Sequence, residues 1–137
     1  MYNLTSHWLD VINAAWQYNA VYSGESDYNI KNSIADIDEY NILFDNLKPC
    51  KYKYNHGTSD RYHTGFIAQE VVKAIENANL TTKDFAGVIH LEEPNRNGCE
   101  WLLRRDEFVA LNTWQIQKLK SRVLELENKL AVLEKKE

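Results

Sequence analysis

The stretch IQKLKSRVLELENKLAVL, residues 116–133, carries the clearest structural signal in the sequence. Its large apolar residues recur at alternating spacings of three and four, at Ile116, Leu119, Val123, Leu126, Leu130 and Leu133. This spacing is a heptad repeat, with the first, third and fifth of these residues at position a and the others at position d. We therefore expect a long helix whose apolar seam pairs with other copies of itself in a coiled coil.

Charged residues beside the seam indicate how many helices assemble. Arg122 at position g and Glu127 at position e are five residues apart, and Lys129 and Glu134 repeat this arrangement in the next heptad. In parallel helices, position g of one chain lies next to position e of its partner. The run from Arg122 to Glu127 also resembles the known trimer-favouring coiled-coil motif, so we expect a parallel homotrimer. The alternative is an amphipathic helix folded back on its own domain, because three heptads are the minimum for a coiled-coil assignment.

The heptad repeat continues toward the N-terminus through one polar residue. Val109 takes position a and Asn112 takes position d, immediately before the apolar seam. A polar residue at a seam position can fix the register of the helices.

The composition limits the fold and the partners. The chain has 137 residues, 44% of them hydrophobic, which is enough to bury one core but hardly two. The net charge is −4 and no block of Lys and Arg lies outside the last helix, so we expect no nucleic-acid partner. Met1 to Asp10 lacks the features of a signal peptide, and no stretch approaches the roughly 18 apolar residues of a membrane span. We expect a soluble protein with no membrane partner, in which Cys50 and Cys99 are reduced thiols.

Between residue 26 and the coiled coil, the pattern predicts a small mixed α+β domain. Helical spacing of apolar residues alternates with short runs of strand-like alternation and turn residues. The expected elements, in order, are a helix within residues 34–47 that ends before Pro49, a hairpin of strands around Tyr52 and at 62–67, a helix at 68–78, and a second hairpin of strands at 88–91 and 99–103.

One residue pair could support catalysis. Ser26 and Lys31 are five residues apart, and a desolvated lysine can accept the proton of a serine hydroxyl in acyl chemistry. The spacing alone is weak, because a Ser followed five residues later by a Lys arises by chance about half the time in such a composition. The alternative is a capped turn with a solvated lysine. Phosphate-loop, GxSxG, HExxH and calcium-loop motifs do not occur and the four histidines are scattered, so we expect no cofactor and no metal site.

Four motifs of the sequence occur in a characteristic order. They are Ser-Asp-x-x-x-Lys at 26–31, Leu-x-Pro at 47–49, His-Thr-Gly-Phe-Ile-Ala-Gln-Glu-Val at 63–71, and the heptad helix. In this order they resemble the C-terminal intramolecular chaperone, auto-processing domain of phage tailspikes and tail fibres. The endosialidase-type domain is its best-known form, and a related domain occurs in myelin regulatory factor. The resemblance covers residues 26 to about 137, and residues 80–100 show no motif of this family.

The resemblance implies a chaperone that cuts itself off. Such a homotrimer holds three chains in register while an upstream β-rich fibre segment of the same polypeptide folds, and then cleaves between Glu25 and Ser26. It acts as a self-cleaving serine peptidase, once and in cis, with Ser26 as nucleophile and Lys31 as general base. Asp27 is a candidate for orienting this dyad.

The resemblance also gives a role to the segment at 63–71. It places His63 and Gly65 near the trimer contact or the processing site. The alternatives are a structural histidine before a strand and a glycine that lets another backbone approach closely. We expect Phe66, Ile67 and Val71 to lie in the core.

The expected organisation has three segments. Residues 1–25 are the end of the upstream client, residues 26–111 the chaperone auto-processing domain, and residues 112–137 the trimeric coiled coil. We expect processing in the host cytoplasm during phage assembly, with the fibre retained in the virion and the chaperone released. The alternative function is a permanent, non-catalytic trimerisation module of a fibrous protein. A hydrolase with an external substrate would need a pocket and further polar groups that the sequence does not show.

Overall fold

The computed structural model describes residues 26–58 and 60–136. The chain consists of two compact units, Met1–Ala35 and Asp36–Glu137. The expected client segment, residues 1–25, and with it Glu25 of the expected cleavage site, lie outside the described residues.

The described part of the first unit contains a short turn. The 3-10 helix η1, Tyr28–Ile30, begins after Asp27, whose Oδ1 accepts a hydrogen bond from the backbone N–H of Asn29 at 2.7 Å. An Asp side chain commonly satisfies a free N–H group at a helix start in this way. Lys31 ends the helix, because its backbone turns to the extended conformation while its N–H still bonds to the Tyr28 carbonyl. All side chains of residues 26–35 are exposed.

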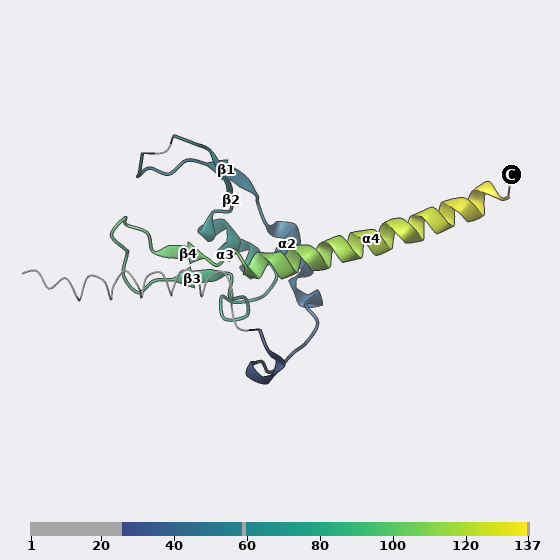
Figure 1. The fold of residues 1–137 in the computed structure, drawn as a ribbon, viewed down its shortest axis with the longest axis horizontal. Coiled ribbons are helices and arrows are strands. Elements are labelled where there is room, and N and C mark those ends of the chain that lie inside the picture. The colour runs from purple at the N-terminus through teal and green to yellow at the C-terminus, as the bar shows by residue number, and fades with distance from the viewer. Residues whose placement is uncertain (1–25, 59, 137) are drawn as a thin grey trace, which may run out of the picture. The chain divides into compact units, whose positions relative to one another are not determined.

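The described residues of the second unit form short helices, two antiparallel hairpins and one long helix (Figure 1). In chain order, the elements are η2 Asp38–Tyr40, α2 Asn41–Asn46, β1 Cys50–Tyr52, β2 His63–Gly65, α3 Ala68–Asn77, β3 Val88–His90, β4 Trp101–Leu103 and α4 Glu107–Glu134. In the first hairpin Tyr52 lies opposite His63, and in the second Val88 lies opposite Leu103. Both predicted hairpins, the predicted helix at 68–78 and the small mixed α/β class are confirmed.

The predicted helix within residues 34–47 is shorter than the pattern indicated. It is realised as η2 followed by α2, and it ends at Asn46, before Pro49 as predicted. Ile34 is 59% exposed and lies outside both helices. Leu47 is already extended, which prepares the chain for Pro49.

The core of the second unit lies where α2, α3 and the start of α4 meet the second hairpin. α2 packs on α3, and α3 packs on β3 and β4. The phenyl rings of Phe66 and Phe85 contact Phe108 at centroid distances of 5.1 and 5.4 Å. The buried apolar side chains are Leu43, Val71, Ala74, Ile75, Phe85, Val88, Phe108 and Leu111.

The expectation that Ile67 is a core residue is wrong. Ile67 is 44% exposed, whereas Val71 is buried and Phe66 packs against the core. Ile67 is extended and directly precedes α3. Successive side chains of an extended segment point to opposite sides, so the inward position of Phe66 turns Ile67 outward.

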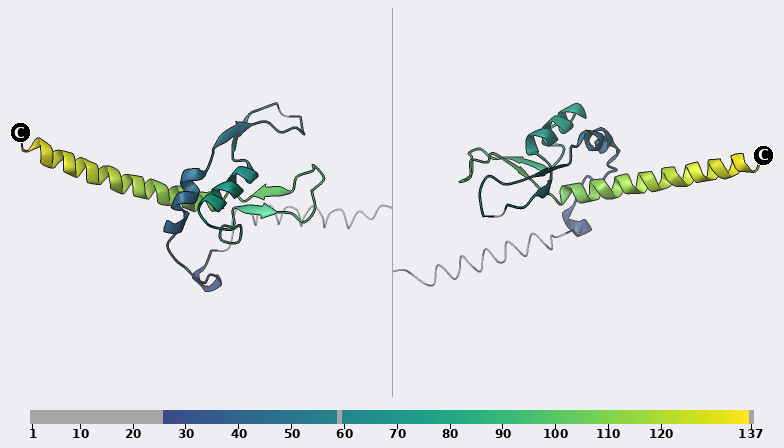
Figure 2. Two further views of the ribbon diagram at one scale, coloured as in Figure 1. Left: turned by 180° about the vertical axis from the view of Figure 1, so that it is seen from behind. Right: turned by 90° about the horizontal axis from the view of Figure 1, so that it is seen from above.

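Helix α4 begins in the core and continues beyond it (Figure 2). Phe108, Leu111 and Gln115 are buried, and the side-chain amide of Gln115 donates to Asn41 Oδ1 at 3.2 Å. Lys118 Nζ donates to the same oxygen at 3.0 Å. From residue 116 to residue 136 every side chain is exposed, and the six seam residues are 49–65% exposed. The alternative of a helix folded back on its own domain is therefore wrong for this part of α4.

Candidate functional site

The turn around η1 brings the predicted dyad together. Lys31 Nζ donates a hydrogen bond to Ser26 Oγ at 2.6 Å. The carboxylate of Asp27 caps η1 at the backbone N–H of Asn29, so it supports the turn between the two dyad residues. A role of Asp27 in orienting the dyad stays a prediction.

The geometry of this pair suits proton transfer. A serine hydroxyl within hydrogen-bond reach of a lysine amine is what general-base activation of a nucleophile requires. The base must be the neutral amine, and removal from water is what favours a neutral lysine. Ser26 and Lys31 are both exposed in the single chain. The pair is therefore in reach but not shielded from water.

His63 lies in an aromatic cluster on the first hairpin. Its ring stacks on Tyr52 at a centroid distance of 5.8 Å and meets Tyr54 edge-on at 5.0 Å. The hydroxyl oxygens of Tyr52 and Tyr54 are 3.3 Å apart, and this hydrogen bond, with burial second, raises the pKa of Tyr52 above its ordinary value. The two tyrosines are partners of His63 that were not predicted from the sequence. Their period-two spacing, which puts both on one face of an extended strand, was the available signal.

The neighbour of Gly65 is the side chain of Tyr52 and not another backbone segment. A Cβ atom added at Gly65 would lie 3.4 Å from Cε1 of Tyr52, which is an ordinary van der Waals contact. The alternative reading of Gly65 as a site of close backbone approach is wrong in the single chain. His63 and Gly65 belong to the second unit, whereas Ser26 and Lys31 belong to the first.

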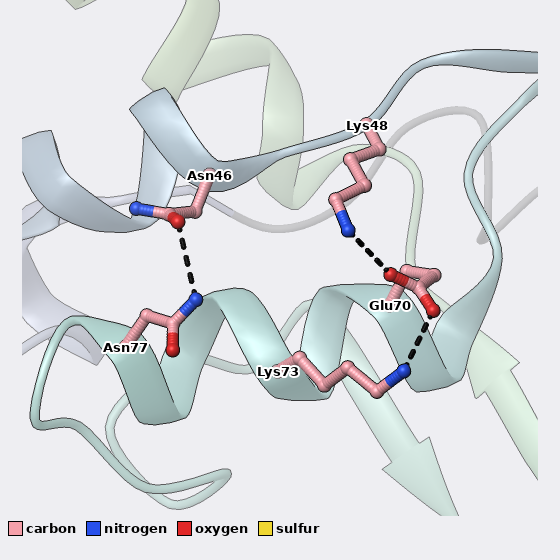
Figure 3. A network of polar contacts seen from close by, with 5 residues as sticks. All are labelled: Asn46, Lys48, Glu70, Lys73 and Asn77. Carbon is pink, nitrogen blue, oxygen red and sulfur yellow. Dashed lines mark hydrogen bonds and ion pairs between the residues drawn. The ribbon is translucent and has the colours of Figure 1, made fainter.

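Glu70 joins two of the sequence motifs. This last glutamate of the His-Thr-Gly-Phe-Ile-Ala-Gln-Glu segment accepts Lys48 Nζ of the Leu-Lys-Pro segment at 2.9 Å (Figure 3). Its other oxygen accepts Lys73 Nζ, one turn along α3, at 2.8 Å. These hydrogen bonds, that from Lys73 first, lower the pKa of Glu70 to about 2. Glu70 thus holds the start of the first hairpin against α3.

The lowered pKa of Glu70 predicts a pH-dependent contribution to stability. The folded pKa of about 2 lies below the ordinary value of 4.5, so the ion pairs stabilise the fold fully above pH 4.5 and the contribution is lost as the pH falls through 2. We expect Glu70→Gln to lower the melting temperature slightly at pH 7, because these pairs are solvent-exposed, and the gap from wild type to close between pH 4.5 and 2. Circular dichroism melts measure this gap. Glu92→Gln, in an exposed loop, is the control, and a gap that stays constant with pH would contradict the assignment.

No metal centre or membrane span is found in the described part of the chain. Residues 26–58 and 60–136 contain no group of three or more His, Cys, Asp or Glu that could hold a metal ion. Within the same residues, no helix is long and apolar enough to cross a membrane. Cys50 and Cys99 are both free thiols, as predicted.

One large cavity opens in the second unit. Its volume is about 1000 Å³, and it lies between the two hairpins and the first turns of α4. Tyr52, Phe66 and Trp101 line it on the hairpin side, and Val109 and Asn112 line it from α4. The first two seam positions of α4, at Val109 and Asn112, thus form part of the cavity wall.

Comparison with known proteins supports the resemblance drawn from the sequence. Residues 26–80 match a peptidase family whose model is described as the chaperone of endosialidase. A crystal structure described as a novel intramolecular chaperone superposes with a TM-score of 0.54, at 24% identity, over 71% of this chain and 99% of that one. At this identity the likeness shows a shared fold. A search of curated proteins gives no match. The predicted resemblance to the endosialidase-type chaperone domain is thus confirmed for residues 26–80.

Proposed function

From the premise that the chain carries an intramolecular chaperone domain of the endosialidase type, we propose that it works as a homotrimer and processes itself. The trimer registers an upstream β-rich fibre or spike segment of the same polypeptide and is released by cleavage between Glu25 and Ser26. The hydrogen bond of 2.6 Å between Lys31 Nζ and Ser26 Oγ carries this proposal. The family match begins at Ser26, the residue that cleavage would make the new N-terminus.

The proposed reaction uses only these two side chains and water. Ser26 Oγ forms a bond to the carbonyl carbon of Glu25 while its proton moves to the neutral amine of Lys31. The C–N bond between Glu25 and Ser26 then breaks, and the Ser26 nitrogen takes that proton from Lys31. An ester between Glu25 and Ser26 Oγ results, together with a free amino group on Ser26. Water hydrolyses the ester, which restores the hydroxyl and leaves a carboxylate on Glu25.

The packing of α4 supports assembly through the heptad seam. Phe108, Leu111 and Gln115, which are buried in the second unit, occupy heptad positions g, c and g. Positions a and d stay free, and Val109 and Ile116 at position a are 61% and 65% exposed. The unit therefore uses one face of α4 and leaves the apolar seam for other chains. Burial of such a seam is the main driving force for coiled-coil formation.

The charged residues beside the seam have local partners in the single chain. Arg122 Nη1 and Lys129 Nζ both donate to Glu125, three and four residues away along the helix. Hydrogen bonds from Lys129 and Arg122 lower the pKa of Glu125. In the proposed trimer the same cations are free to exchange Glu125 for Glu127 and Glu134 of a neighbouring helix, at little cost because exposed pairs are weak.

A charge placed in the seam is expected to dissociate the trimer. Leu126→Asp would bring three carboxylates into one buried layer at position d, which is strongly unfavourable. We expect the variant to be monomeric at micromolar concentration in sedimentation equilibrium, where wild type is trimeric. Leu124→Asp is the matched control, because Leu124 is 58% exposed and Leu126 49% exposed but Leu124 lies outside the seam.

Two control variants show whether loss of the trimer is specific to the seam. Leu124→Asp and Arg122→Ala are both expected to remain trimeric, since neither residue occupies position a or d. A trimeric Leu126→Asp variant would show that another surface holds the chains together.

The exposure of the dyad supports a second candidate function. Ser26 and Lys31 are both open to water in the single chain, as surface residues of a permanent, non-catalytic trimerisation module would be. In this case the only function is trimerisation through the coiled coil, and the chain stays intact. The mass of the purified chain separates the two functions.

For the self-cleaving function we propose processing in the host cytoplasm during assembly, with the fibre retained in the virion.

A further inference from the structure

Asn112 is a polar residue at a seam position that the chain leaves free. It is exposed on the second turn of α4, next to Val109, and the heptad repeat gives it position d. Both residues line the cavity of about 1000 Å³ described above. In a parallel trimer the three copies of Asn112 would meet on the threefold axis, between the apolar layers of Val109 and Ile116.

We propose that three copies of Asn112 bind one halide ion on the axis of the trimer. The proposal rests on the trimeric assembly of the proposed function, and it assigns to the coiled coil a ligand site of its own. The ligand class is a monatomic anion, because the layer between Val109 and Ile116 has the height of a single side chain.

The number of hydrogen-bond donors and acceptors on Asn112 favours an anion as the ligand. An asparagine side chain has two N–H donors and one carbonyl oxygen. Within the described residues the side chain of Asn112 makes no hydrogen bond, and the neighbouring hydroxyl of Thr113 donates to the Val109 carbonyl of its own helix at 2.9 Å. In a ring of three, each amide can give one N–H to the carbonyl oxygen of the next copy. One N–H per copy is then left, and the threefold symmetry allows all three to converge on the axis.

An anion satisfies these donors better than water does. In this ring three N–H groups would converge on one point, whereas a water molecule has two lone pairs and two protons that would face the apolar Val109 and Ile116 layers. A buried donor left without a partner is costly. A halide accepts all three hydrogen bonds and donates none.

The surrounding charge favours an anion as well. Arg105 lines the same cavity as Val109 and Asn112 and supplies one cation per chain. Of the acidic residues that follow it, Asp106 is the N-cap that precedes α4, and Glu107, the first residue of the helix, takes position f, which faces away from the axis. The parallel helices also direct their positive dipole ends toward this end of the coil.

The test is the halide dependence of trimer stability in the full chain. We expect the melting temperature of wild type to rise with the bromide or chloride concentration, relative to fluoride at equal ionic strength, because an ion that binds only the assembled state stabilises it. In Asn112→Leu, which fills the layer with an apolar side chain, we expect this stabilisation by bromide to be lost, so that only the general effect of the salt on both proteins remains. Crystals grown in bromide should show an anomalous peak on the threefold axis at the Asn112 layer.

Sedimentation equilibrium on the same samples separates the possible failures. A wild-type trimer that bromide stabilises no more than it stabilises Asn112→Leu, or one with a water molecule on the axis, would overturn the halide site and leave the proposed function standing. A wild-type monomer would overturn both. Asn112→Gln, which keeps the amide but places it one methylene further out, is expected to stay trimeric with weaker bromide dependence, and equal dependence would also count against the site.

Discussion

A chain that ends after Lys118 is expected to keep its folded second unit but to lose both trimerisation and cleavage. The truncation retains Phe108, Leu111 and Gln115 in the core and the contacts of Gln115 and Lys118 with Asn41. It removes the seam from Leu119 onward, without which three chains have no reason to meet. We expect a monomer in sedimentation equilibrium and an intact mass after days, where wild type is processed. Circular dichroism and a cooperative melt would show that the unit itself still folds.

Cleavage is expected to depend on assembly because the Ser26 and Lys31 pair must be shielded from water to react. Lys31 and Ser26 are hydrogen-bonded but exposed in the single chain, and a neutral lysine base requires removal from water. Assembly is the step that can supply this shielding. It also raises the effective concentration of the three upstream segments, whose non-local strand pairing is slow and prone to aggregation. A chaperone that cut before assembly would release unregistered chains.

A replacement coil gives the matched rescue. An unrelated parallel trimeric coiled coil, fused in register after Lys118, is expected to restore at least part of the cleavage, whereas a parallel dimeric coil is not. Efficient cleavage by the truncated monomer would show that Ser26 and Lys31 need only their own chain, and the assembly checkpoint would have to be abandoned.

Removal of either dyad side chain is expected to stop processing. Ser26→Ala has no nucleophile, so we expect no product at all. Lys31→Ala loses the general base, and a loss of at least ~100-fold in the rate of cleavage is expected. Lys31→Arg keeps the positive charge and most of the length of the side chain, but a guanidinium does not give up its proton in proteins. We therefore expect Lys31→Arg to be as inactive as Lys31→Ala in a mass-spectrometric time course.

A nearby serine provides the control for this series. Ser33 lies in the same segment and its hydroxyl donates to Asn32 Oδ1, so Ser33→Ala leaves the dyad contact in place. We expect Ser33→Ala to be processed at the wild-type rate. Cleavage of Ser26→Ala at the same bond would mean that another nucleophile or an outside protease acts there.

Local sequence patterns predicted most elements of the fold. The heptad spacing from Ile116 to Leu133 predicted the long helix, and the turn residues between apolar runs predicted both hairpins. Ile67 is exposed although it belongs to a short apolar pair, Phe66 and Ile67, both of which were predicted to lie in the core. Only the inward orientation of Phe66, which its packing on Phe108 fixes, decides which of the two side chains faces water.

Contacts between distant residues could not be predicted from one sequence. Glu70 and Lys48 are 22 residues apart, and Gln115 and Asn41 are 74 apart, and no periodicity relates the members of either pair. The dyad is different, because its five-residue spacing is local and a single capped turn closes it. The spacing alone arises often by chance, so the order of four motifs was needed to single out Ser26 and Lys31.

The mass of the freshly refolded wild-type chain tests the central claim most directly. If the chain processes itself, a species that begins at Ser26 and extends to Glu137 accumulates with time, together with the complementary fragment that ends at Glu25, and N-terminal sequencing of the larger species starts Ser-Asp-Tyr. A trimeric wild-type chain that keeps its full mass indefinitely, with no fragment at this bond, would contradict autoproteolysis and leave a permanent trimerisation module.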